Sequence, residues 1–219
     1  AARGQVLLAP PFNEEMNRCR SMVTLQAQAL AALGWGTLVL DLNGTGDSSG
    51  DYVDGRWGDW LANLSAGRDW LQQQPGGCRA VWGIRLGTIF AAELHARWAD
   101  PAMALLLWQP VTDGKTHLTQ FMRVRIAAAM SRADLPKETT SNMRQTWADG
   151  GTVEIAGYEL HADLAKAIDA AALTQHTLPA GVHLFWLEQA VPDQEGLSPA
   201  SARALATWPG AQSKVTQQT

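Results

Sequence analysis

The sequence predicts an α/β fold in which a mostly parallel, doubly wound sheet carries a helical cap insertion. Short, fully apolar runs alternate along the chain with segments whose apolar residues recur at helical spacing, a pattern typical of parallel strands buried on both faces. The apolar runs stop between about residues 113 and 173 and then return. We therefore expect one compact domain, with its core in residues 1–112 and 174–219 and a cap in residues 113–173.

The first half of the chain reads as three strand-helix pairs. Each pair begins with an apolar run and continues with apolar residues every three or four positions, until glycine or proline stops the helix. Gly34 ends the first helix, and Pro75-Gly76-Gly77 follows the second. The expected strands cover residues 5–9, 37–40 and 80–82, and the expected helices cover residues 22–33, 57–71 and 90–98.

The second half completes the sheet around the insertion. Strands are expected at residues 103–108 and 182–187, and Ser198-Pro199, an N-cap followed by proline, opens a last helix that reaches about Trp208. Residues 213–219 are polar and carry no capping signal, so we expect a trimmed chain end. Within the insertion we expect helices at residues 118–130 and 141–147, an extended piece at 153–160, and a helix that carries Leu164, Ile168 and Leu173.

Composition and charge exclude several classes of protein. Hydrophobic residues make up 46% of the chain and charged residues 17%, so disorder is excluded as the dominant state. The net charge is −4 and no basic run occurs, which argues against nucleic acid as a partner. Cys19 and Cys78 stand far apart, which excludes a disulfide scaffold and a Cys-x-x-Cys metal site. We expect a cytoplasmic protein with no metal, no cofactor and no membrane span.

One loop has the sequence context of a nucleophile elbow. Ligands bind at the carboxyl ends of strands in open parallel sheets, and three loops arrive there, at residues 10–17, 41–50 and 83–87. The last of these, Gly83-Ile84-Arg85-Leu86-Gly87, stands between a strand and a helix, and its small flanking residues let one side chain project toward a substrate. The central residue is Arg85, which stays protonated and cannot attack a carbonyl group. The sequence therefore predicts elbow geometry without the nucleophile.

A literal Gly-x-Ser-x-Gly motif occurs elsewhere, with Ser48 at its centre. It lies well beyond the end of its strand and no helix follows at once, so we favour a loop serine that bonds local backbone. A serine nucleophile also needs a base. The five histidines are His95, His117, His161, His176 and His183, and none follows the last expected strand. The alternative is an active esterase or thioesterase that uses Ser48 with an unidentified base or one beyond Thr219.

Arg85 itself has two interpretations. It forms an internal ion pair with Glu14, Glu15 or Asp113, because an arginine buried without a partner costs several kcal/mol. Alternatively, Arg85 and the N–H groups of the following helix form an anion site for carboxylate or phosphate. One of the glutamates is also expected to complement a helix dipole, and Asp113 would serve equally as a turn residue.

The aromatic residues divide between the core and the cap. Ten tryptophans are present, and Trp57, Trp60, Trp70 and Trp98 fall at helical spacing, which favours packing in the core. Trp147 and Tyr158 lie in the cap, where an aromatic residue has no sheet to cover. We therefore expect these two residues to line a ligand pocket.

Five motifs stand in a fixed order along residues 5 to about 190: residues 10–18 (Pro-Pro-Phe-Asn-Glu-Glu-Met-Asn-Arg), Asp41-x-x-Gly44-x-Gly46-Asp47-Ser48, Gly83-x-Arg85-x-Gly87, residues 108–114 and residues 153–158. Together they resemble the α/β-hydrolase-superfamily proteins encoded with exosortase A systems, specifically their second hydrolase-like type. The resemblance implies an α/β-hydrolase fold, a bacterial source and an association with exopolysaccharide production and protein sorting. It also implies that an arginine at the elbow belongs to the pattern of this group.

The function that follows is a nominal ester or thioester hydrolase that binds a small anionic or acyl ligand with little turnover. The candidate ligand-binding residues are Phe12, Glu14, Glu15, Arg85, Trp147 and Tyr158, and the catalytic candidates are Arg85, Ser48 and Asp113. Two alternatives stay open: the Ser48-dependent esterase, and a structural partner for another protein of an exosortase or exopolysaccharide locus, with the cap as the interface.

Overall fold

The computed structural model describes residues 2–130, 138–189, 196–211 and 215–218. The chain divides into two compact units. The core unit contains residues 1–40, 64–112 and 172–219, and the insertion unit contains residues 41–63 and 113–171. Residues 41–63 thus belong with the insertion, whereas the sequence placed them in the core.

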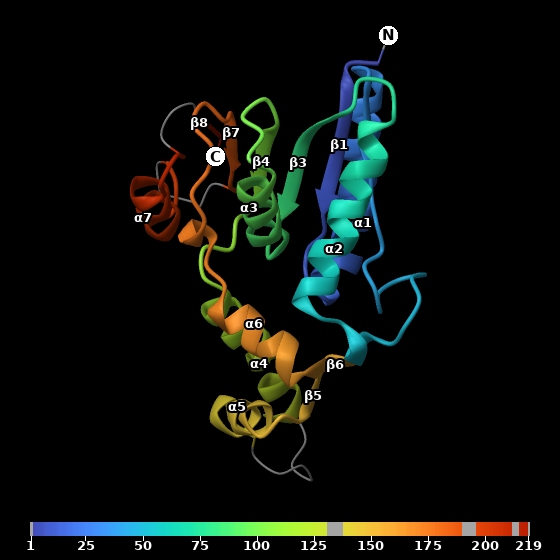
Figure 1. The fold of residues 1–219 in the computed structure, drawn as a ribbon. Coiled ribbons are helices and arrows are strands. Elements are labelled where there is room, and N and C mark those ends of the chain that lie inside the picture. The colour runs from blue at the N-terminus through green and yellow to red at the C-terminus, as the bar shows by residue number, and fades with distance from the viewer. Residues whose placement is uncertain (1, 131–137, 190–195, 212–214, 219) are drawn as a thin grey trace. The chain divides into compact units, whose positions relative to one another are not determined.

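The core unit is built on a six-stranded sheet in which every pair of neighbouring strands is parallel (Figure 1). The strand order is β2-β1-β3-β4-β7-β8. This sheet confirms the predicted α/β fold class. Its strands are β1 (Gly4–Ala9), β2 (Trp35–Leu38), β3 (Cys78–Ile84), β4 (Ala104–Trp108), β7 (Leu184–Leu187) and β8 (Val215–Gln218).

The helices of the sheet are α1 (Glu14–Ala32), α2 (Trp57–Gln72), α3 (Gly87–Trp98) and α7 (Pro199–Thr207). Three of them, α2, α3 and α7, begin and end within three residues of the predicted positions, whereas α1 begins at Glu14, eight residues before the predicted start at residue 22. Ser198 caps α7 as expected, because its Oγ accepts a hydrogen bond of 3.3 Å from the Ser201 N–H. Leu173, expected on the last helix of the insertion, instead begins the 3-10 turn η2 (Leu173–Gln175) after that helix has ended.

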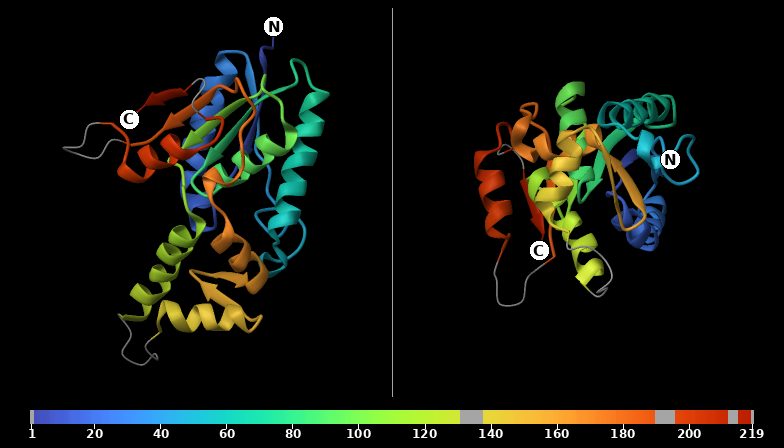
Figure 2. Two further views of the ribbon diagram at one scale, coloured as in Figure 1. Left: turned by 60° about the vertical axis from the view of Figure 1, so that its left-hand side comes forward. Right: turned by 90° about the horizontal axis from the view of Figure 1, so that it is seen from below.

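Strand β8 was not predicted from the sequence. Val215–Gln218 pairs in parallel with β7 at the edge of the sheet, as Figure 2 shows. The segment reads as polar because an edge strand needs backbone hydrogen bonds on one side only and is not buried on both faces. Residues 213, 214 and 219 of this predicted tail lie outside the described residues.

The insertion unit is helical with one hairpin. Its helices are α4 (Gly114–Met130), α5 (Thr140–Ala148) and α6 (Ala162–Ala170), and the 3-10 turn η1 (Tyr52–Asp54) joins them. The extended piece expected at residues 153–160 is an antiparallel hairpin of β5 (Thr152–Ile155) and β6 (Tyr158–His161). Ala156 and Gly157 form its two-residue turn with φ of 53° and 84°, the backbone that such a tight hairpin requires.

The segment 41–63 joins this unit through side chains of the 3-10 turn and the residues after it. The ring of Tyr52 meets the ring of Tyr158 edge-on at 5.1 Å, and Arg56 Nε lies 3.4 Å from Asp163 Oδ2. The sequence held no sign of these contacts, because their partners are about a hundred residues away along the chain. Within the described ranges, no helix is long and apolar enough to cross a membrane.

Candidate functional site

The turn between β3 and α3 has the backbone of an elbow. Arg85 has a φ of 55°, a left-handed conformation that is uncommon for a residue with a long side chain. Its N–H donates to the Trp108 carbonyl at 3.1 Å, and its carbonyl accepts from both the N–H (3.0 Å) and the hydroxyl (2.6 Å) of Thr88. Thr88 is fully buried, and its Oγ1 also accepts from the Val111 N–H at 3.2 Å. These hydrogen bonds hold the strained residue in place.

The two glycines of the motif are required by close packing. A Cβ on Gly87 would lie 2.2 Å from the Ala9 carbonyl oxygen and 2.5 Å from that of Pro10. A Cβ on Gly83 would lie 2.5 Å from Thr88 Cα. Because these neighbours are backbone atoms, neither clash can be relieved by rotating a side chain. Glycine is therefore required at both positions by the backbone that packs against them, a reason that the sequence did not reveal.

The Arg85 side chain forms the predicted ion pair, and its partner is Glu15. Arg85 Nε donates to Glu15 Oε1 at 2.9 Å, and Arg85 Nη1 lies 3.4 Å from the Gln109 carbonyl oxygen. The Arg85 and Glu15 side chains are 31% and 34% exposed, so the ion pair is partly accessible to solvent and does not lie in the core. Glu14, the neighbouring candidate, pairs with Arg18 on the exposed side of α1 at 2.5 Å.

Two residues beside Arg85 were not identified from the sequence. Asn13, Arg85 and Gln109 all have positive φ, and they follow β1, β3 and β4, which are neighbours in the sheet. Left-handed backbone in residues other than glycine leaves no signal in a single sequence. Phe12, a predicted ligand residue, and Asn13 are both 4% exposed in the loop after β1. Three loops with positive φ thus follow the carboxyl ends of three neighbouring strands.

Glu15 and Cys19 are the acid and the thiol that influence the electrostatics around Arg85. Glu15 Oε2 is buried and makes no hydrogen bond within the part of the chain that the structure describes. Cys19 lies one helical turn after Glu15 on α1. Burial raises the pKa of the Cys19 thiol, the charge of Glu15 raises it further, and Arg85 opposes both. The thiol therefore stays protonated at neutral pH and is a poor nucleophile.

Ser48 lies in a turn of the insertion unit. Its N–H donates to the Thr45 carbonyl at 3.0 Å, and Gly46 and Gly50 on either side have φ of 55° and 86°. The Asp47 N–H donates to Asp41 Oδ2 at 3.0 Å and closes the same loop. The motif around Ser48 is thus a sequence of glycine turns and lacks the strand-turn-helix context of an elbow.

Asp113 also belongs to the insertion unit. Its Oδ1 accepts from the Thr116 N–H at 2.6 Å at the start of α4, which is the role of a helix cap. The sequence offered two roles for Asp113, a partner of Arg85 and a local turn residue. The observed hydrogen bond to Thr116 agrees with the local role.

Three histidines have hydrogen bonds to groups other than the elbow. His95 Nε2 donates to the Met103 carbonyl at 2.7 Å, and His183 Nε2 lies 2.9 Å from Thr216 Oγ1. In the insertion unit, His161 Nδ1 accepts from the Asp163 N–H at 3.1 Å. Burial lowers the pKa of His95, so this imidazole is neutral at neutral pH. All five histidines precede β8, the last strand described.

The cap aromatics have packing partners within the insertion unit. Trp147 is 3% exposed, and its indole N–H donates to the Leu160 carbonyl at 3.0 Å. Tyr158 is half-buried against Tyr52. Their role in lining a ligand pocket stays a prediction. Among the described residues, no group of three or more His, Cys, Asp or Glu side chains is placed to hold a metal ion.

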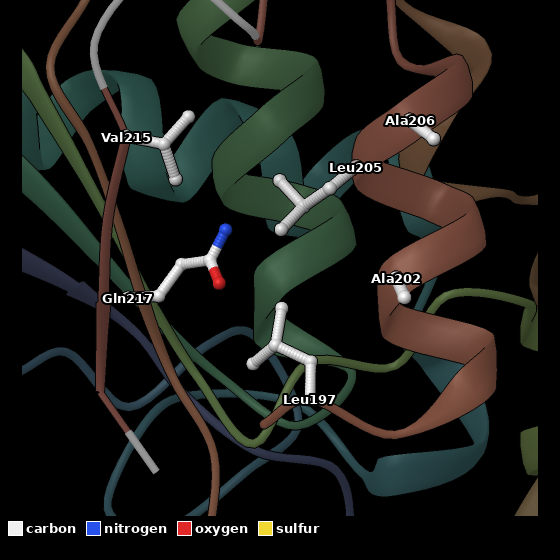
Figure 3. Close-up of a pocket in the computed structure, with 6 residues that line it drawn as sticks. All are labelled: Leu197, Ala202, Leu205, Ala206, Val215 and Gln217. Carbon is white, nitrogen blue, oxygen red and sulfur yellow. The ribbon is translucent and has the colours of Figure 1, made fainter. Parts of the chain in front are cut away.

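A pocket of about 440 Å³ lies between α7 and the edge strand β8 of the core unit (Figure 3). The described residues that line it are apolar apart from Gln217, and none of them carries a charge. It does not include the elbow, Glu15 or Gln109. The residues are Leu197, Ala202, Leu205, Ala206, Val215 and Gln217.

Comparison with known proteins identifies solved structures with a similar fold. No protein-family model matches the chain, and no curated protein matches it. Among solved structures, the chain is similar to Est1E from Butyrivibrio proteoclasticus, solved with ferulic acid bound (TM-score 0.64, 16% identity, covering 100% of this chain and 79% of that one). It is also similar to the α/β hydrolase GrgF from Penicillium sp. sh18 (0.64, 14%, 99% and 81%). A third is the monoacylglycerol lipase of Paleococcus ferrophilus (0.59, 15%, 99% and 84%).

These similarities cover nearly the whole chain at low identity, which is the level at which fold is shared and function is not implied. The parallel central sheet with its flanking helices agrees with them. The chain has the α/β-hydrolase fold.

Proposed function

We propose that this protein binds a small acyl ligand by its anionic, carboxylate-like end at the Arg85 elbow, with little ester turnover. The observation that carries the proposal is the arginine itself, held in left-handed backbone at the position where an elbow presents its functional side chain. A guanidinium cannot act as a nucleophile, but it recognises carboxylates through several N–H donors.

The surroundings of Arg85 support binding of an anion with an apolar tail. Among the contacts of Arg85 with described residues, Nε makes a short hydrogen bond to Glu15 at 2.9 Å, and the contact of Nη1 with the Gln109 carbonyl is long at 3.4 Å. Helix α3 begins at Gly87, directly after Leu86, and the first N–H groups of a helix attract negative charge. Phe12 in the loop after β1 and Leu86 in the elbow are buried apolar residues, which favours an acyl ligand over a fully polar one.

Low turnover follows from what the chain offers as nucleophile. The elbow residue is cationic, burial keeps the Cys19 thiol protonated, and Ser48 lies in a turn of the other unit. A serine without an activating base is a weak nucleophile. The nominal ester or thioester hydrolase activity that the fold suggests is therefore expected near background.

Titration of the protein with sodium octanoate, followed by NMR chemical shifts, tests the binding proposal. We expect saturable binding to the wild type and at least tenfold weaker binding to Arg85→Gln. Arg97→Gln is the matched control, because Arg97 also pairs with a glutamate of the core unit, Glu93, and should leave affinity unchanged. Equal affinity of all three proteins would refute the proposal.

On the motif resemblance we further propose a cytoplasmic role beside an exosortase A system, with a protein partner from that locus. Deleting the gene in a bacterium that encodes such a system should impair exopolysaccharide production, and Arg85→Gln should fail to restore it. Normal exopolysaccharide production in the deletion strain would refute this assignment.

A further inference from the structure

The ion pair at the elbow leaves little net charge for a ligand. Arg85 Nε donates to Glu15 Oε1 at 2.9 Å. Among the described residues, no second acid pairs with Arg85 and no second cation pairs with Glu15. The other carboxylate oxygen of Glu15, Oε2, is buried and accepts no hydrogen bond within the described ranges. The guanidinium and the carboxylate therefore cancel most of each other's charge at this position.

A second carboxylate, that of Glu188, belongs to the same edge of the sheet. Glu188 directly follows β7, which pairs with β4, and β4 pairs with the strand that ends before Arg85. Neighbouring strands lie about 4.8 Å apart, so the backbones of Glu188 and Arg85 are about 10 Å apart. The Trp186 indole N–H and the Ser198 backbone N–H each donate to the Glu188 carboxylate at 3.2 Å. Burial raises the pKa of Glu188, but hydrogen bonds outweigh burial and hold the pKa below its ordinary value, so this carboxylate is ionised at neutral pH.

The other charged side chains of α1 do not restore a positive charge at the elbow. Glu14 and Arg18 pair with each other at 2.5 Å. Arg20 stands five residues after Glu15, which places the two on different faces of the helix. Burial and the charge of Glu15 raise the pKa of the Cys19 thiol, so this group stays neutral. Close to the elbow, the described part of the core unit thus sets one guanidinium against two carboxylates.

We propose that Glu15 determines the specificity of the elbow by favouring ligands with one negative charge over dianions such as phosphate monoesters. The inference rests on the proposed binding at Arg85 and adds the charge class of the ligand. The Coulomb energy of a bound ligand is proportional to its charge, whereas the cost of removing it from water rises with the square of its charge. Because Glu15 cancels most of the attraction of Arg85, a second negative charge on the ligand costs more than it gains.

Three ligands with the same alkyl chain length separate the effect of charge from that of shape. Sodium octanoate is a planar monoanion, octyl sulfate is a tetrahedral monoanion, and octyl phosphate is tetrahedral and doubly charged at pH 8, since the second pKa of a phosphate monoester is about 6. Isothermal titration at pH 8 and low salt measures the affinity of each ligand for the wild type. We expect octanoate and octyl sulfate to bind within threefold of each other and octyl phosphate to bind at least tenfold more weakly.

Glu15→Gln tests whether Glu15 causes this preference. The repulsion by Glu15 is proportional to the ligand charge, so its removal should strengthen binding of the two monoanions about tenfold and of octyl phosphate about a hundredfold. The preference for monoanions should therefore fall about tenfold. Asp69→Asn is the matched control, because it removes an acid of the core unit that lies in the last turn of α2 and is paired with Arg68, and it should change each affinity less than twofold.

The outcomes distinguish this inference from the proposed function on which it rests. If octyl phosphate binds the wild type as tightly as octanoate, or if Glu15→Gln strengthens binding of all three ligands equally, selection by charge is overturned while binding at Arg85 stands. If octyl sulfate binds as weakly as octyl phosphate, the selectivity belongs to ligand shape and the inference is again overturned. If Arg85→Gln binds octanoate as tightly as the wild type, the proposed function is refuted, and the inference with it.

Discussion

Neutralising Glu15 should strengthen binding of a carboxylate at Arg85. In the free protein, Glu15 Oε1 occupies the Nε donor of Arg85 at 2.9 Å and cancels its charge. A ligand carboxylate on the remaining donors would lie ~4.5 Å from Glu15, where two like charges repel by about 4 kcal/mol at an effective dielectric constant near 20. Both side chains are about a third exposed, so water and salt reduce this repulsion to roughly 1.5 kcal/mol.

Glu15→Gln is therefore expected to bind octanoate about tenfold more tightly than the wild type, since ~1.4 kcal/mol corresponds to tenfold. Isothermal titration at pH 7 and low salt measures this difference, which should shrink at higher salt. Glu14→Gln is the matched control: it removes the neighbouring carboxylate, which pairs with Arg18 and not with Arg85, and should change affinity less than twofold. Unchanged or weaker binding by Glu15→Gln, or an equal gain in both variants, would refute the reasoning.

Three further predictions concern the elbow and the core. Gly87→Ala should lower the free energy of unfolding by about 3 kcal/mol in urea titrations, because the new Cβ would lie 2.2 Å from the Ala9 carbonyl oxygen. The control is Gly58→Ala in a helix, where no atom lies within 4 Å of the new Cβ, and it should raise the free energy of unfolding by up to ~1 kcal/mol. Burial lowers the pKa of His95 in the folded protein, so the neutral imidazole stabilises the fold above the unfolded pKa of ~6.5, and this stability is lost as the pH falls. Between pH 7.5 and 5.5 the free energy of unfolding should therefore fall more for the wild type than for His95→Gln. Equal losses in the two proteins would contradict this. Arg85→Ser should leave hydrolysis of p-nitrophenyl acetate at background, since the new serine gains no base, and robust turnover would contradict the account.

The strands and helices of the core could be predicted because their signals are local. Apolar runs mark β1, β3, β4 and β7, and Ser198-Pro199 marks the start of α7. Strand β8 could not be predicted, because Val215–Gln218 has the composition of a polar tail and becomes a strand by pairing with β7. The place of residues 41–63 likewise depends on tertiary contacts such as that of Tyr52 with Tyr158.

The candidate site was predictable in its chemistry and less so in its geometry. The unusual residue in Gly83-x-Arg85-x-Gly87 and the cost of an unpaired guanidinium together predicted an acid beside Arg85. Which acid it is depends on the helical phase of α1: Glu15 reaches Arg85, and Glu14, one residue earlier, reaches Arg18 instead. The left-handed backbone of Asn13 and Gln109 comes from the fold around them and has no sequence signal.

The central claim is that the elbow carries a binding residue in place of a nucleophile. Labelling of the purified protein with a fluorophosphonate probe, read by intact mass, tests it most directly, because such probes modify activated serines. Wild type and Ser48→Ala should both remain unlabelled under conditions that fully label a serine esterase. Stoichiometric labelling of the wild type that disappears in Ser48→Ala would contradict the account and establish a serine hydrolase.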